Sequence, residues 1–316
     1  SPGQPKPAVY QQLNAEVTNV SPTASSPFEL SAQVPGGGSI TADGTAGPFN
    51  QNSPISTPFN AHAVLTHIDF ASSGVLAPDA GISGITNADV KATSNGEACN
   101  ATAIANIQGL LVAKNGFPSA RLVDVQLTVA QDLHALTGQI QSASVSVGKA
   151  VIHISGIYKT DGPATDIDVK VTSDSASIDE LEAFLPSVGV HLPSGSRLQG
   201  GTLTTNLHVT GTTAAPVISG PVLLSNTGLA GFDLGSKLSA ITRLTGGKTG
   251  ANTAIRSLST NVNINGGNVR TDNLALDVPS LGTASGSGTI SASGALNYNP
   301  VLKPNALTKG SSPIDG

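Results

Sequence analysis

Aromatic and basic side chains are scarce in this sequence of 316 residues. Phe, Trp and Tyr together make up 3% of it, and the 15 Lys and Arg residues never cluster. A phosphate backbone would therefore find no basic surface, and nucleic-acid bases would find few rings to stack on. The composition makes nucleic acid an unexpected partner.

Cysteine is limited to Cys99, which excludes an internal disulfide and any zinc or iron–sulfur site built on cysteine spacing. The histidines are not spaced as metal ligands either. The nearest two, His62 and His67, are five residues apart and would point to opposite faces of a strand. We therefore expect no metal site and no cofactor.

Catalytic motifs are missing as well. No serine lies in a Gly-x-Ser-x-Gly pattern. Asp166 and Asp168 flank Ile167 and would share the outer face of a strand, at a separation that a glycosidase could use. Because no aromatic residues lie nearby to hold a sugar, we interpret both as solvated surface charges. No catalytic residue is predicted, and an enzyme acting on glycans or peptides is only the third hypothesis.

Long apolar runs are also absent, since none approaches the roughly 18 residues of a membrane span. The proline-spaced start, residues 1–7, is expected to be an extended linker that follows a segment outside this chain. We expect residues 1–20 to form an extended arm or first strand. Residues 21–316 are expected to form a single elongated β domain, with an internal boundary considered near 115–120.

Glycine and proline, by contrast, are abundant at 36 and 20 residues, and most lie singly between short apolar runs. Such punctuation favours many short strands joined by turns. Disorder is the competing interpretation, but the apolar share of 38% and a regular alternation argue against it. About fifteen strands fit the chain, too many for one compact sandwich. We predict a mainly β fold: a long, highly curved, mostly antiparallel sheet shaped like a groove, with two short α-helices.

The first helix is predicted from a capping box. Ser177 would accept a hydrogen bond from the Glu180 amide while the Glu180 side chain reaches back to the Ser177 amide. Leu181 and Phe184 would give this helix an apolar side, and Pro186 would end it.

The second helix is predicted within residues 229–244, where apolar residues recur at helical spacing. We expect this stripe to dock against one end of the curled sheet; it comprises Leu234, Leu238, Ile241 and Leu244. The following Gly246-Gly247-Lys248-Thr249 ends like a phosphate-binding loop but follows a helix instead of preceding one. We interpret it as a glycine helix stop.

Several short motifs occur in a fixed order over nearly the whole chain. They are Pro35-Gly36-Gly37-Gly38 with Gly44 and Gly47-Pro48, Leu185-Pro186 with Leu192-Pro193-Ser194-Gly195, Gly200-Gly201-Thr202-Leu203, Gly220-Pro221-Val222 leading into the stretch from Leu229 to Leu238, Arg270-Thr271-Asp272-Asn273-Leu274 and Gly286-Ser287-Gly288-Thr289-Ile290. In this order they resemble the AsmA family of bacterial envelope proteins, particularly its C-terminal half. The resemblance implies a β groove related to bridge-like lipid carriers, which moves phospholipid across the periplasm and supports outer-membrane assembly. It also implies a periplasmic location, an inner-membrane anchor that is absent here, envelope-protein partners and no catalytic residues.

The leading hypothesis is accordingly a groove that binds phospholipid or another acyl-chain lipid. Its predicted lining consists of alternating apolar residues: Val123, Val125, Leu127, Val129, Ile167, Val169, Val171, Leu203, Leu207 and Val209. Their partners on the other side of each strand are polar, so one face would be apolar and one solvated. Closure by the two helices would instead turn the groove into a filled core.

The alternative hypothesis is structural. Unpaired strand edges can template the addition of further strands, so the chain could assemble into an extracellular fibre or surface layer. Self-association would then use the arm of residues 1–20 as a donated strand.

Overall fold

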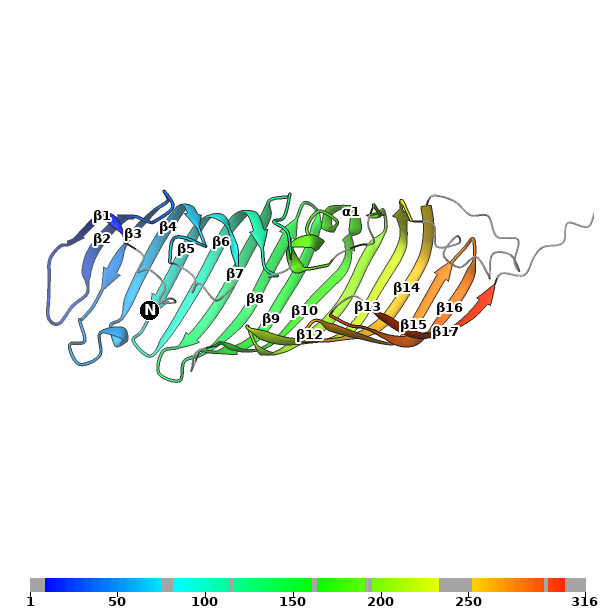
Figure 1. The fold of residues 1–316 in the computed structure, drawn as a ribbon. Helices are drawn as coiled ribbons and strands as arrows, with labels where there is room; N and C mark the ends of the chain where they lie inside the picture. The colour runs from blue at the N-terminus through cyan, green and yellow to red at the C-terminus, as the bar shows by residue number, and fades with distance from the viewer. Residues whose placement is uncertain are drawn as a thin grey trace, which may run out of the picture.

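The computed structural model describes residues 9–74, 82–113, 116–160, 164–190, 192, 195–232, 252–292 and 295–304. Nearly all of this chain forms one open sheet of 17 strands (Figure 1). With one exception, the short strand of residues 197–199, each strand pairs antiparallel with the next along the chain, so the sheet is a meander. The expectation of a long, antiparallel, curved β-sheet is confirmed.

The strands are β1 Gln11–Val17, β2 Ser26–Gln33, β3 Ser39–Ala46, β4 Phe59–Asp69, β5 Ser83–Ser94, β6 Ala98–Leu111, β7 Val123–Asp132, β8 Thr137–Val147, β9 Ala150–Lys159, β10 Asp166–Ser177, β11 Arg197–Gln199, β12 Thr202–Thr212, β13 Ala215–Ala230, β14 Asn252–Asn265, β15 Asn268–Val278, β16 Gly282–Ile290 and β17 Leu296–Pro304. Helical turns are η1 Pro54–Ser56, α1 Ile178–Leu181 and η3 Leu185–Val188. β11 and β12 both pair with β13 and so occupy one position in the sheet.

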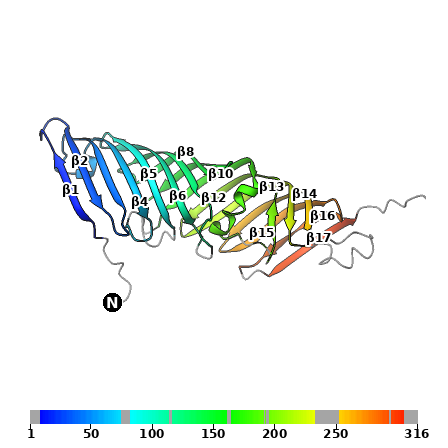
Figure 2. The ribbon, with the colours of Figure 1, turned by 90° about the horizontal axis from the view of Figure 1, so that it is seen from above.

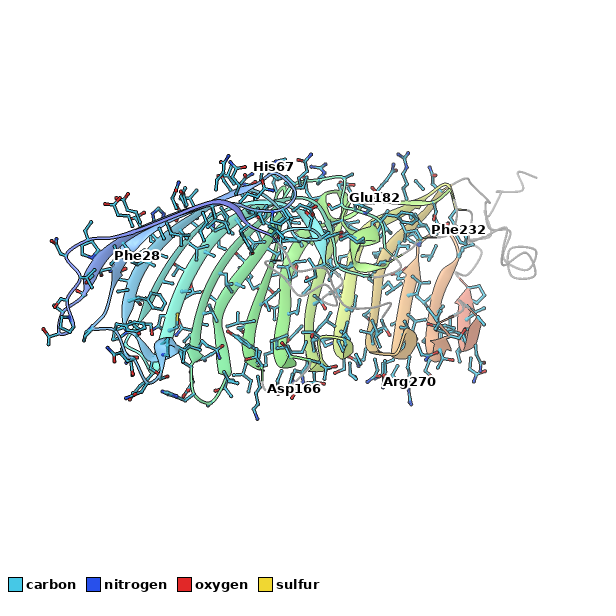
Figure 3. The ribbon with its side chains drawn as sticks, turned by 60° about the vertical axis from the view of Figure 1, so that its left-hand side comes forward. Phe28, His67, Asp166, Glu182, Phe232 and Arg270 are labelled. Carbon is cyan, nitrogen blue, oxygen red and sulfur yellow. The ribbon has the colours of Figure 1, made fainter. Side chains whose placement is uncertain are left out.

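The sheet is much longer than it is wide, and β1 and β17 lie at its opposite ends (Figures 1 and 2). Neighbouring strands lie about 4.8 Å apart, which makes the sheet roughly 70 Å long. Figure 3 shows the strands as curved ribs between two rims. We call the rim that carries His67, Glu182 and Phe232 the upper rim, and the rim with Asp166 and Arg270 the lower rim.

The helix predicted from the capping box begins where expected, but the capping box itself does not form. Ser177 makes no side-chain cap hydrogen bond. The carboxylate of Glu180 instead forms an ion pair with Arg121, with Nη1 and Oε2 2.6 Å apart. A charged partner binds a carboxylate more strongly than a backbone amide does, so Glu180 ties α1 to the segment before β7.

The second helix is not found where it was expected to begin. Leu229 and Ala230 belong to β13, where they pair with Thr253 and Asn252 of β14. The ladder to β14 therefore extends the strand into residues that the local helical spacing had assigned to a helix. The predicted docking residues, Leu234, Leu238, Ile241 and Leu244, lie outside the described residues. Within the described ranges α1 is the only α-helix.

Bulges shift the alternation within several strands. His67, Ser175 and Asn273 have positive φ angles, and at each of them two residues oppose one on a neighbouring strand. The His67 amide donates to the Asn87 side chain at 2.9 Å, which satisfies a group that the ladder leaves unpaired. Because a bulge bends and twists its strand, these positions contribute to the curvature of the sheet.

Two tyrosines cover glycines on the strand beside them. A Cβ added to Gly138 would fall within the ring of Tyr158, and one added to Gly288 would meet the ring of Tyr298. The two residues of each pair lie directly opposite one another in the ladder. A ring laid over a glycine restores the packing that the missing side chain cannot supply.

This contact predicts the effect of Gly138→Ala. The new methyl group would displace the Tyr158 ring, and we expect a loss of about 1–3 kcal/mol in the free energy of unfolding, as for other overpacked sites. In a Tyr158→Ala background the same substitution should cost much less. Denaturant unfolding of the four proteins of this double-mutant cycle measures the coupling. Equal costs in both backgrounds would contradict the contact.

Candidate apolar binding face

Directly opposed residues of an antiparallel ladder point to the same face of the sheet, so the register shows which side chains line up. One row of apolar residues and glycines crosses the sheet from β1 to β16. This first row is Val17, Phe28, Gly44, Ala61, Ala92, Ala101, Val129, Ile140, Gly156, Val169, Val209, Ile218, Ile264, Val269 and Ile290.

A second row runs beside the first on the same face. It is Ala15, Leu30, Ala42, Ala63, Val90, Ala103, Leu127, Ala143, Ile154, Val171 and Leu207. Neither row contains a charged residue. We call the surface of these rows the apolar face and the opposite surface the polar face.

All the predicted lining residues lie on the apolar face. Six of them belong to the two rows: Leu127, Val129, Val169, Val171, Leu207 and Val209. The other four are Val123, Val125, Ile167 and Leu203, which flank the rows on β7, β10 and β12. Sequence alternation therefore identified residues that share a face, but it missed the alignment across strands, which depends on the register.

The apolar face is the less accessible of the two. On the polar face Ile104 is 65% exposed and Ile157 is 57% exposed. On the apolar face Leu127 of β7 and Ile154 of β9 are both half-buried. Leucine and isoleucine side chains of similar size are thus less exposed to solvent on the apolar face than on the polar face. This difference indicates that the sheet curves toward the apolar face.

A small packed core covers part of the apolar face beside the upper rim. Leu181 of α1 and Phe184 pack with Val123, Val147 and neighbouring residues into one buried cluster. Val123 is fully buried there, so it belongs to this core and does not line an open surface. Among the described residues, the segment after β10 covers the upper ends of the central strands and also contacts β11 (Figure 3). In these strands Ala143 and Val169 of the two rows are buried, and the other row residues remain half-buried.

The size of the side chains changes along the apolar face. From β3 to β6 the face is lined mostly by alanines: Ala42, Ala61, Ala63, Ala88, Ala92, Ala101, Ala103 and Ala105. From β7 onward valine, leucine and isoleucine prevail, as at Leu127 and Val171. Alanine is a poor strand former, and its small size leaves more room above this half of the face.

The polar face carries the charged side chains of the central strands. His62 Nε2 lies 2.9 Å from Asp89 Oδ2, and His62 Nδ1 lies 3.6 Å from Asp43 Oδ1. Asp168 forms a similar pair with His208 at 2.6 Å. Within the described ranges, no group of three or more His, Cys, Asp or Glu residues is placed to hold a metal ion.

A hollow of about 730 Å³ near the lower rim is a second possible location for a ligand. Its lining includes Ala130, Ile157 and Asp168 from the polar face, with Tyr158 and Ile167 from the apolar face. Burial raises the pKa of the Tyr158 phenol, and burial likewise raises the pKa of the Cys99 thiol. Both groups therefore stay protonated at neutral pH, and neither is activated as a nucleophile.

Comparisons with known proteins found no matching family model, no matching curated protein and no matching solved structure. In the part of the chain that the structure describes, no helix is long and apolar enough to cross a membrane.

The polar face leads to a pH prediction for His62. The hydrogen bond to Asp89 is the main reason that the pKa of His62 lies above its usual value, and Asp43 adds to the rise. The contribution of protonated His62 to folding stability is therefore fully present below the unfolded-state pKa of about 6.5, and it is lost as pH rises through the folded-state pKa. An NMR titration should show the raised pKa, and Asp89→Asn should lower it more than Asp43→Asn. A pKa that neither substitution changes would contradict these contacts.

Proposed function

We propose that this chain binds phospholipid or another acyl-chain lipid by laying the acyl chains along the apolar face. The observation that supports this best is the uncharged first row, which extends from β1 to β16 and is half-buried for nearly all of its length. An apolar strip of this size on a curved surface is what a long, flexible hydrocarbon needs. Single exposed apolar residues would not carry the same inference, because they are normal on protein surfaces.

The energetics of apolar burial allow an acyl chain to bind firmly and still move along the face. Each methylene that is fully withdrawn from water contributes about 0.8 kcal/mol of binding free energy. Because the apolar face covers only one side of the acyl chain, each methylene gains part of that free energy. The attraction has no preferred direction. Since the rows repeat at every strand, a bound acyl chain meets a similar surface about every 4.8 Å and can slide from strand to strand.

The resemblance to the AsmA family supports the same function and suggests where it operates. Under this proposal the lipid is a phospholipid of the bacterial envelope, the location is the periplasm and the protein assists outer-membrane assembly. Envelope proteins would deliver or accept the lipid at the ends of the sheet.

The first test compares two aspartates on adjacent residues of β7. Leu127→Asp places a charge in the second row, whereas Gln126→Asp places the same charge on the polar face. We expect the unmodified chain to copurify with lipid that mass spectrometry detects. Leu127→Asp should reduce the bound lipid severalfold because a buried charge is costly, and Gln126→Asp should leave it unchanged.

Two outcomes would contradict the proposal. One is a lipid-free protein that also fails to bind added phospholipid. The other is a loss of lipid in Ile157→Asp but not in Leu127→Asp, which would place the lipid in the hollow near the lower rim. Thermal unfolding of each variant shows whether the fold is retained.

A second test changes volume without adding charge. Ala103→Phe would fill space over the alanine-lined half of the apolar face, while Thr102→Phe adds the same ring to the exposed polar face of the same strand. We expect Ala103→Phe to lower the amount of bound lipid and Thr102→Phe to have no effect. Equal lipid binding by both variants would show that the alanine-lined half is not occupied.

A further inference from the structure

The two edge strands of the sheet differ in their capacity to accept another strand. β17 contains Pro300 and Pro304, and proline in an edge strand directs its nitrogen, which has no hydrogen, toward solvent. These prolines are four residues apart, so both remove donors from the same outer side. β1 contains no proline, and Glu16 is its only charged residue. Natural edge strands are protected by proline, charge and bulges; β17 carries two prolines, whereas β1 carries only Glu16 and one bulge between Gln11 and Asn14, which leaves residues 14–17 as a regular edge.

The β1 edge also exposes several large apolar side chains. Every residue of β1 is exposed. Leu13 is 63% exposed and Val17 is 53% exposed, and Val9 and Val20 on either side are more exposed still. In the described part, β1 pairs only with β2. Residues 11–17 therefore pair with β2 of the chain's own sheet.

We propose that β1 is a dimerisation edge, where a second copy of this chain adds its own β1 antiparallel. A two-fold axis perpendicular to the sheet produces this pairing, and closed two-fold dimers are the commonest oligomers. Such an axis keeps the apolar faces of both copies on the same side. The second row would then continue from one copy into the other through Ala15, and Val17 at the end of the first row would lie on the same side.

The side chains of β1 suit a register centred on Ala15. Ala15 then faces Ala15 of the second copy, and Glu16 faces Asn14 on the polar face. Val17 reaches Leu13 on the apolar face. The register avoids placing the two Glu16 carboxylates opposite each other, which would be unfavourable.

The pairing needs no lipid, so its test is independent of the proposed function. In a Cys99→Ser background, Ala15→Cys places two thiols opposite each other across the two-fold axis. Directly opposed Cα atoms in a sheet are about 4.5–5.5 Å apart, which a disulfide spans. Mild oxidation of the full chain should give a covalent dimer. Val301→Cys, exposed on β17, is the matched control and should stay monomeric.

Sedimentation of the lipid-free chain over a wide concentration range tests the non-covalent dimer. The unmodified chain should pass from monomer to dimer and no further. Leu13→Lys with Val17→Lys should raise the dimer dissociation constant roughly tenfold or more, because it places charges in the new ladder. Val301→Lys should leave the dissociation constant unchanged.

Three results would overturn the dimer. The first is a chain that stays monomeric at every concentration and gives no Ala15→Cys crosslink. The second is an equal effect of the β1 and β17 substitutions. The third is growth beyond dimers, since head-to-tail pairing of β17 with β1 would not close. Lipid binding that persists in a monomeric chain would leave the proposed function intact.

Discussion

The antiparallel backbone ladder is the interaction on which the rest of this molecule depends. Because neighbouring strands of the sheet pair antiparallel in a fixed register, the residues of one row stay on one face of the sheet. A slip of a single residue would turn an entire strand over and interrupt both rows. The bulge in β10 shows how strictly the faces are kept. Before Ser175 the odd-numbered residues, such as Val171, lie on the apolar face, and after it the even-numbered Ala176 does.

The sheet buries little of its apolar surface in a conventional core. In the part of the chain that the structure describes, the packed core cluster lies where Leu181 and Phe184 cover the upper ends of the central strands. Elsewhere the ladder itself and cross-strand contacts such as Tyr158 over Gly138 hold the strands together. An apolar face that stays open costs stability, since its burial would be favourable. A ligand that covers the face would offset this cost.

The fold class was predictable from sequence because alternation and turn residues are local signals. Which residues of β7 share a face could be predicted for the same reason. The alignment of Leu127 with Ala103 and Ala143 could not, because register depends on neighbouring strands. The segment in which the second helix was predicted begins as strand at Leu229 and Ala230, because the local pattern cannot report the distant strand that pairs with them. The capping box failed because Arg121, far along the chain, binds Glu180. The slip in alternation at Ser175 was a signal for a bulge that a closer comparison of apolar positions would have found.

Site-specific photocrosslinking tests most directly whether lipid lies along the apolar face. A photoreactive side chain would replace Leu127 or Val262 on the apolar face, and Gln126 or Asn263 beside them on the polar face. Irradiation with phospholipid should crosslink lipid at Leu127 and at Val262, in opposite halves of the sheet, and not at the two polar-face positions. Crosslinks of equal yield from both faces, or none from the apolar face, would contradict a lipid-binding role for this face.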